Sequence, residues 1–199
     1  MSADVVVYGF ETSNNVKVRI ALAYKGVPFE FRTIDPGDRE TVVRISGQHL
    51  TPVLVHGDRV VHDSAAILRY LDTTFGEGPK LFGTGRDEQW AIEDLELMAR
   101  WALAGPMMAV IHRRVRGENV PDEELAVCQE AFARAAAKYA ERLAGRSWLV
   151  GDSMTAADIT AAAVFWRVRG AGLFELGELE GAIQPWVDRV IAFDPGPNG

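Results

Sequence analysis

The sequence has a single cysteine, Cys128, and so cannot form a disulfide within the chain. It also lacks the Cys-x-x-Cys spacing of redox centres and structural zinc sites. No apolar run approaches the roughly 20 residues that a membrane-spanning helix needs. Residues 1–4 carry no basic region ahead of a short apolar run, so we do not expect a signal peptide. These absences predict a cytoplasmic protein without a membrane partner.

Positive charge is also scarce, because 21 Lys and Arg residues stand against 28 Asp and Glu residues. The net charge of −7 argues against the basic stripe that a nucleic-acid-binding surface needs. His56 and His62 are not at metal-ligand spacing with any partner, and no Gly-rich phosphate loop or catalytic triad stands out. We therefore expect no metal and no nucleic acid. The 48% hydrophobic content is enough for a substantial core.

Residues 1–76 alternate strand-like and helix-like patterns, as expected for a mixed sheet covered by helices. The expected elements, in order, are a strand at 5–8, a helix at 15–24, a strand at 29–34, a short helix ending near 44, a hairpin of 52–55 with 59–61, and a helix beginning at Asp63 or Ser64.

The Gly- and Pro-rich residues 77–85 form the clearest domain boundary, and strand patterns largely vanish beyond them. The lack of strand patterns in residues 86–199 therefore predicts an all-helical domain. Its first helix is expected to be long and amphipathic, bent at Gly105-Pro106, with an apolar face made of Trp90, Leu97, Met98, Trp101 and Met108. Residues 194–199 are expected to form a loose tail.

Two short segments carry the functional hypothesis: Thr51-Pro52-Val53-Leu54 and, ten residues on, Asp63-Ser64-Ala65-Ala66-Ile67. Placed after a β-α-β unit, they resemble the glutathione-binding signature of glutathione transferases. The resemblance implies a thioredoxin-like N-terminal domain followed by an all-α C-terminal domain. It also implies a cis bond before Pro52 and a Val53 backbone free to pair with the extended tripeptide. Asp63 and Ser64 would hold the γ-glutamyl end of glutathione at a helix N-terminus.

The segment from Tyr8 to Arg19 is a strand, a polar turn and a capped helix. Similar glutathione transferases place here a hydroxyl or thiol that stabilises the glutathione thiolate. A free thiol has a pKa near 8.5, so little of it is ionised at neutral pH. Thr12 aligns with the family's serine when counted back from Val18-Arg19, and Ser13 falls one place later. The resemblance implies Thr12 or Ser13 as the catalytic hydroxyl, with Asn14 as a supporting donor and Tyr8 as a structural residue.

Other segments extend the resemblance over nearly the whole chain. Thr155 and Asp158 have capping-box spacing, similar to the box that starts the buried helix of the second domain. Leu50 departs from the family pattern, because a polar residue for the glycine end of glutathione is common there. His49 or Gln48 is expected to make that contact instead.

The resemblance implies a homodimeric glutathione S-transferase that uses glutathione as co-substrate, needs no cofactor, and joins the thiolate to a small hydrophobic electrophile. The second-substrate pocket is expected to be walled by Trp101, Met108, His112 and Trp166. The basic cluster around His112 is either a solvated face or an attractor of an anionic co-substrate. Two alternatives stay open: a glutathione-dependent disulfide reductase or peroxidase, suggested by the nu-class-like Thr12 and Asn14, and a non-catalytic ligand-binding protein.

Overall fold

The computed structural model describes residues 4–198 and divides into two compact units. The first runs to Phe82 and takes in the stretch from Ala192 onward, and the second is Gly83–Ile191. The expected boundary at 77–85 contains the division between Phe82 and Gly83. Residues 192–198, which were expected to belong to the helical domain, cluster with the first unit by their contacts.

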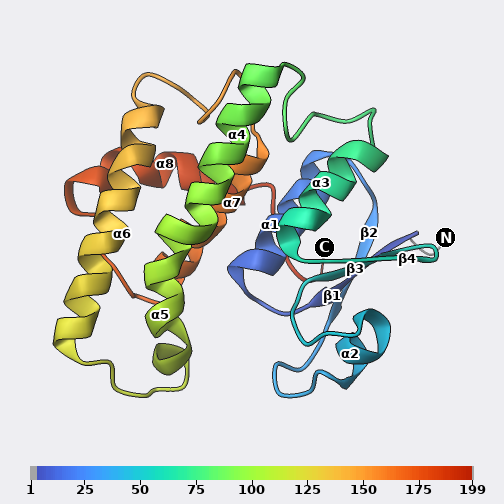
Figure 1. The fold of residues 1–199 in the computed structure, drawn as a ribbon, viewed down its shortest axis with the longest axis horizontal. Coiled ribbons are helices and arrows are strands. Elements are labelled where there is room, and N and C mark those ends of the chain that lie inside the picture. The colour runs from blue at the N-terminus through green and yellow to red at the C-terminus, as the bar shows by residue number, and fades with distance from the viewer. Residues whose placement is uncertain (1–3, 199) are drawn as a thin grey trace. The chain divides into compact units, whose positions relative to one another are not determined.

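The first unit holds a four-stranded sheet with helices on both faces (Figure 1). Its elements are β1 (Val5–Gly9), α1 (Ser13–Tyr24), β2 (Phe29–Thr33), α2 (Glu40–Ser46), β3 (Val53–His56), β4 (Arg59–His62) and α3 (Ser64–Thr74). Helices α1 and α3 lie side by side on one face of the sheet, and α2 lies on the other (Figure 1).

The strand order β2-β1-β3-β4 places β1 and β3 in the middle of the sheet. β1 runs parallel to β2, as the α1 crossover requires, and antiparallel to β3, which forms a hairpin with β4. Val5, Val7 and Leu54 are buried on these central strands. The expected β-α-β-α-β-β-α order is therefore confirmed, and it brings the end of β1 and the start of β3 close to the starts of α1 and α3.

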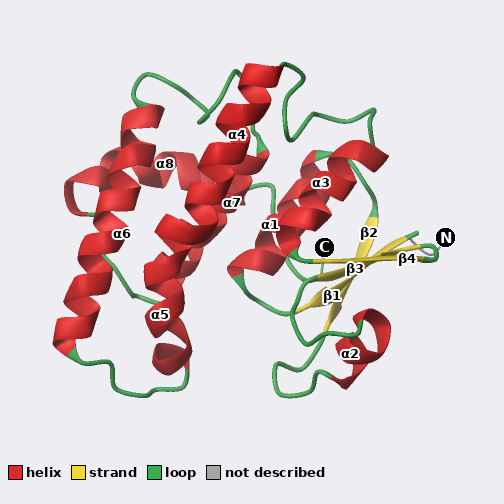
Figure 2. Cartoon of the chain, in the orientation of Figure 1, coloured by secondary structure: helices red, strands yellow, loops and turns green. Residues whose placement is uncertain are grey.

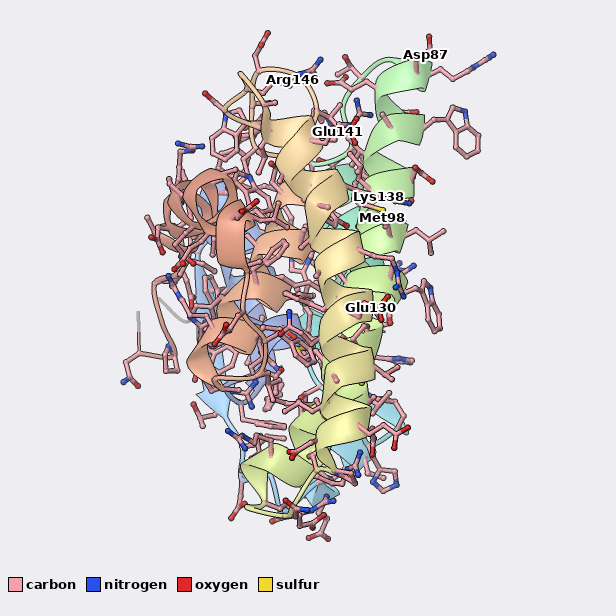
Figure 3. All side chains as sticks on the ribbon, turned by 90° about the vertical axis from the view of Figure 1, so that its left-hand side faces the viewer. Asp87, Met98, Glu130, Lys138, Glu141 and Arg146 are labelled. Atoms are coloured by element: carbon pink, nitrogen blue, oxygen red, sulfur yellow. The ribbon has the colours of Figure 1, made fainter. Side chains whose placement is uncertain are left out.

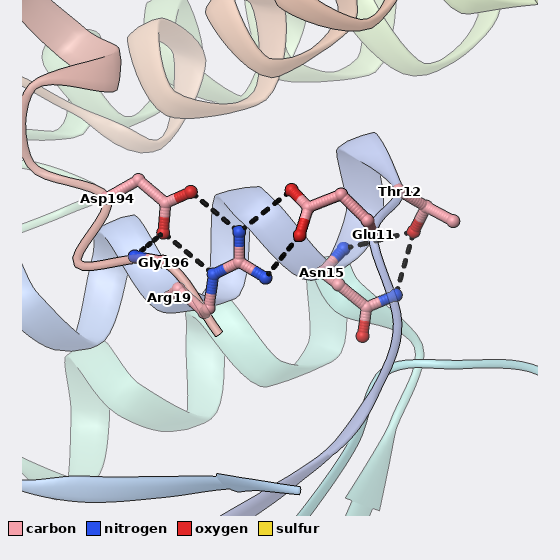
Figure 4. Close-up of polar contacts among 6 residues, drawn as sticks. All are labelled: Glu11, Thr12, Asn15, Arg19, Asp194 and Gly196. Atoms are coloured by element: carbon pink, nitrogen blue, oxygen red, sulfur yellow. Dashed lines mark hydrogen bonds and ion pairs between the residues drawn. The ribbon is translucent and has the colours of Figure 1, made fainter. Parts of the chain in front are cut away.

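Asp194, the first residue of the expected loose tail, is held to α1 by a buried arginine. Arg19 is fully buried and donates from Nε and Nη2 to Asp194, both at 2.7 Å, and from Nη2 to Glu11 at 3.0 Å (Figure 4). Phe193 packs edge-on against Tyr24, with ring centroids 5.3 Å apart. Burial alone lowers the pKa of Arg19, but its bonds to the two carboxylates outweigh that effect and raise the net pKa.

Replacing Asp194 by Ala is expected to lower the free energy of unfolding by about 2–4 kcal/mol, because a buried guanidinium loses one of its two anionic partners. Urea denaturation followed by circular dichroism measures the loss. Asp188→Ala is the matched control, since it removes the exposed pair with Arg169 and should cost less than about 1 kcal/mol. Equal effects of the two substitutions would contradict the structural role of the tail.

The second unit is built of helices alone among its described residues (Figure 2). They are α4 (Arg86–Met98), the π-helical segment η1 (Ala99–Leu103), α5 (Ala104–Val115), α6 (Asp122–Leu143), α7 (Ala156–Gly170), the 3-10 turn η2 (Gly177–Leu179) and α8 (Glu180–Ile191). α7 is buried on nearly every side, as its uniformly apolar sequence predicts. The outward side of α6 carries Glu130, Lys138 and Glu141 (Figure 3).

The predicted apolar face of the first long helix is wrong. The helix buries Ile92 and Leu95, and the continuation through η1 and α5 buries Leu103. The residues that we expected to be buried form an outward stripe instead: Trp90 (69% exposed), Leu97, Trp101 (72% exposed) and Met108. The exposed stripe and the buried residues both keep helical spacing through the π-helical segment, so the prediction had the right period and the wrong face.

The capping box at the start of α7 is confirmed and extends well beyond the cap. Asp158 Oδ2 accepts from the backbone N–H and the hydroxyl of Thr155, while its Oδ1 accepts from the N–H of Leu149 and from Nε1 of Trp186, all at 2.8–2.9 Å. One buried carboxylate thus joins the loop before α7 to α8.

Between residues 4 and 198, none of the helices has the length and apolar character to cross a bilayer.

Candidate functional site

Three segments of the first unit meet through side-chain hydrogen bonds: the start of α1, the loop before β3 and the start of α3. Ser64 Oγ, at the start of α3, donates to Asn14 Oδ1 in α1 at 3.2 Å. Asn15 Nδ2 donates to Thr12 Oγ1 at 2.7 Å and to Thr51 Oγ1 at 3.2 Å. Most of the residues predicted for the glutathione site therefore lie around one point of the fold.

Thr12 is the N-cap of α1, and its side-chain oxygen also accepts from the Asn15 backbone N–H at 3.4 Å (Figure 4). The backbone N–H groups of Asn15 and Val16 bond to the Thr12 carbonyl. No acidic residue occupies the first turn of α1, and the preceding Glu11 is paired with Arg19. The positive end of the α1 dipole is therefore well suited to an anion beside Thr12.

Asp63 is the N-cap of α3 and has a left-handed φ of 67° and a ψ of 120°, an unusual conformation for a residue with a side chain. Its Oδ1 accepts from the N–H groups of Ala65 and Ala66, and its carbonyl accepts from Ile67. The helix start is thus largely capped from within, and the Ser64 hydroxyl donates to Asn14, which leaves the N–H of Ser64 as the donor facing a ligand. Asp63 is exposed at the surface of the site.

The predicted cis bond between Thr51 and Pro52 is confirmed. Val53 is the first residue of β3, directly after the proline, and lies opposite Tyr8 of β1 and His62 of β4. The expectation that its backbone pairs with the extended tripeptide stays a prediction.

Of the two residues proposed for the glycine end of glutathione, Gln48 is committed to its own loop. Its Nε2 donates to Ser46 Oγ and to the Leu50 carbonyl, both at 2.9 Å, and its Oε1 accepts from the Leu50 N–H. This use of the whole amide argues against a ligand contact by Gln48. His49 is exposed beside the loop and stays the candidate.

The remaining hydroxyls differ in their surroundings. The Tyr8 hydroxyl accepts a hydrogen bond from Arg32 Nη1 at 2.9 Å, at the exposed surface of the sheet. This contact fits the structural role expected for Tyr8. Ser13 is the first residue of α1 and is buried, one position after the cap. Sequence reasoning missed Asn15 and Thr51. Their connection spans 36 positions, so no local pattern could have indicated it.

The four residues expected to wall a second-substrate pocket all belong to the helical unit. Trp101 in η1 and Met108 and His112 in α5 are exposed, and Trp166 in α7 is half-buried. They do not line the cavity of about 370 Å³ beside Phe174, nor the one of about 470 Å³ beside Leu173. Their role in substrate binding stays a prediction.

Two other features of the helical unit have ordinary structural explanations. In the basic cluster, Arg113 pairs with Glu124 and Arg116 with Glu118 at the surface, which favours a solvated face. Burial, assisted by the charge of Glu124, raises the pKa of the Cys128 thiol, so this cysteine is not a ready thiolate. Within residues 4–198, no three His, Cys, Asp or Glu side chains gather as metal ligands do.

Comparisons with known proteins agree with this geometry. Residues 7–79 match the family model of the glutathione S-transferase N-terminal domain, and residues 92–194 match that of the C-terminal domain. A glutathione S-transferase of Triticum aestivum is 29% identical over 81% of this chain and 76% of its own. Glutathione S-transferase 1 of Dianthus caryophyllus is 40% identical, but the match spans only 37% of this chain and 36% of that protein.

Among solved structures, a glutathione S-transferase domain-containing protein of Marinobacter aquaeolei VT8 is 29% identical, with a TM-score of 0.79 over 97% of this chain and all of that one. The thioredoxin-like first unit, the all-helical second unit and the two family models lead to one conclusion: the chain belongs to the glutathione S-transferase family.

Proposed function

We propose that the protein is a cytoplasmic glutathione transferase, which joins the thiolate of glutathione to a small hydrophobic electrophile. The observation that carries the proposal is the meeting of Thr12, Thr51 and Ser64 around the side chains of Asn14 and Asn15. It gathers hydroxyl donors and two helix N-termini at one place in the first unit, as an anionic tripeptide requires.

In this proposal, the γ-glutamyl carboxylate is held by the N–H of Ser64 and by the Ser64 hydroxyl, which turns to it from Asn14. Asp63 faces the ammonium group, and the Val53 backbone pairs with the extended tripeptide. The sulfur then lies beside the start of α1, where a hydroxyl donor favours the thiolate over the thiol. The thiolate attacks the electrophilic carbon and forms a C–S bond, while the leaving group departs with its electron pair. The protein contributes binding, orientation and a lowered thiol pKa.

Replacing Ser64 by Ala is expected to weaken glutathione binding about 10-fold, because the γ-glutamyl carboxylate loses the hydroxyl that would turn to it from Asn14. Isothermal titration calorimetry with glutathione measures the change. Ser153→Ala, an exposed serine of the helical unit, is the control and should bind as the unaltered protein does. If the unaltered protein gives no saturable heat at millimolar glutathione, the proposal is wrong.

A second candidate is a glutathione-dependent disulfide reductase, and the position of Asn14 favours it. Its side chain lies between the starts of α1 and α3, where an amide could contact a sulfur next to Thr12. Here the thiolate attacks one sulfur of a disulfide and releases the other as a thiolate. Parallel assays with an aromatic halide and a small disulfide separate the two activities. Binding without turnover in either assay would instead favour the non-catalytic alternative.

We also propose a homodimer, with the exposed stripe of Trp90, Leu97, Trp101 and Met108 as its contact surface. Two tryptophans exposed on one helical face are unusual for a free surface and typical of an interface. Size-exclusion chromatography with light scattering should give twice the chain mass of 21.8 kDa. The double substitution Trp90→Glu and Trp101→Glu should give a monomer, whereas Val127→Glu, on the exposed face of α6, should not. A monomeric unaltered protein would contradict the proposal.

A further inference from the structure

Asn15 is buried at the centre of the candidate site, with none of its surface exposed. A side-chain amide in such a place needs partners for both its NH2 group and its oxygen. The NH2 group has two, the hydroxyl oxygens of Thr12 and Thr51, at 2.7 and 3.2 Å. The oxygen, Oδ1, is buried and has no hydrogen-bond partner within residues 4–198.

Gly9, the last residue of β1, explains the orientation of this amide. A Cβ atom built on Gly9 would lie 1.7 Å from Asn15 Oδ1, so the oxygen rests directly against the glycine backbone. An amide turned by 180° would press two N–H donors against the same surface, and buried donors without an acceptor are costlier than an under-satisfied carbonyl oxygen. The missing side chain at position 9 thus lets the oxygen face the strand and the NH2 group face the two threonines.

The orientation of the amide decides where the Thr12 proton points. A hydroxyl has two lone pairs and one proton to donate. Thr12 Oγ1 accepts from Asn15 Nδ2 and, more weakly at 3.4 Å, from the Asn15 backbone N–H. With both lone pairs used toward Asn15, the proton of the hydroxyl is directed away from it. Accepting these bonds also polarises the O–H group and makes it a stronger donor.

We propose that Asn15 is a positioning residue, which holds Thr12 as an outward hydrogen-bond donor to the glutathione thiolate and ties α1 to the loop before Pro52 through Thr51. The inference rests on the proposed function and deepens it, because it selects Thr12 over Ser13 as the group that stabilises the sulfur anion. Asn15 itself does not touch the sulfur and acts through Thr12.

The test is a pH titration of the glutathione thiolate bound to the full-length protein, followed by its ultraviolet absorbance. Asn15→Ala should lower the thiolate fraction about fivefold at a pH below the bound-thiol pKa, because Thr12 loses its orienting donor. The loss should vanish at high pH, and glutathione affinity measured there should change less than threefold. The same substitution in a Thr12→Val background should have no further effect on the titration.

A second variant, Asn15→Asp, keeps the shape of the side chain in case the alanine variant does not fold. Its carboxylate accepts from both threonines and turns the Thr12 proton inward, so the thiolate fraction should fall at least as far as in Asn15→Ala. Asn15→Asp in the Thr12→Val background measures the effect of the added charge alone. That effect is subtracted from the effect of Asn15→Asp in the protein with Thr12.

Two outcomes would overturn the inference. In one, Asn15→Ala shifts the thiol titration equally with Thr12 present and in the Thr12→Val background. In the other, Asn15→Ala weakens glutathione binding but leaves the pKa of the bound thiol unchanged. A failure of the proposed function is distinct, because it would show in the unaltered protein as absent glutathione binding or an unlowered thiol pKa.

Discussion

Replacing Thr12 by Val is expected to lower kcat/KM for conjugation about 10- to 100-fold near neutral pH. The substitution keeps the shape of the side chain and removes a hydrogen bond to an anion, which is worth about 1.5–3 kcal/mol. The pKa of bound glutathione should therefore rise by about one to two units. Because a raised thiol pKa leaves less thiolate at low pH, the deficit should be greatest there and shrink as the pH rises through the new pKa. A pH–rate profile of kcat measures both effects.

The controls for this prediction keep or move the hydroxyl. Thr12→Ser preserves the donor and should retain most of the activity, whereas Ser13→Ala removes the neighbouring hydroxyl and should cost less than about threefold. Thr12 is also the N-cap of α1, so thermal unfolding is measured in parallel to account for a loss of about 1 kcal/mol. A larger loss in Ser13→Ala than in Thr12→Val would transfer the catalytic role to Ser13.

The largest expected effect on stability comes from Asp158→Ala, at about 3–5 kcal/mol. The substitution removes an acceptor of four hydrogen bonds and leaves the N–H groups of Leu149 and Thr155 and the Trp186 indole unpaired inside the helical unit. Loss of the capping box also weakens the start of α7. Urea unfolding followed by tryptophan fluorescence measures the change in the free energy of unfolding.

Asp152→Ala is the matched control, because this exposed carboxylate lies in the same loop, before α7. It should change stability by less than about 0.5 kcal/mol. Asp158→Asn is expected to fall between the two, since an amide oxygen can still accept from Leu149 and Trp186 while its NH2 group faces the Thr155 donors. A loss below 1 kcal/mol in Asp158→Ala would show that the network contributes little.

The errors of sequence interpretation share one physical origin. Trp90 and Trp101 have helical spacing and large apolar side chains, and those properties do not distinguish a buried face from an exposed stripe. Gln48 has suitable chemistry at a suitable position, but contacts within its own loop already use its amide. Helical periodicity shows that a helix has an apolar face, but it does not show whether other residues cover that face.

The sequence by itself determined the order of elements, the two-part division, the proline turn before β3, the caps of α1, α3 and α7, and the family. Each of these depends on residues within a few positions of one another, where turn chemistry and capping act locally. Only the tertiary structure decided that the tail is held by Arg19, and that Asn15 joins Thr12 to Thr51 against Gly9. The contacts of Arg19 with Asp194 and of Asn15 with Thr51 join residues dozens of positions apart, and their geometry exists only once folding has brought those segments together.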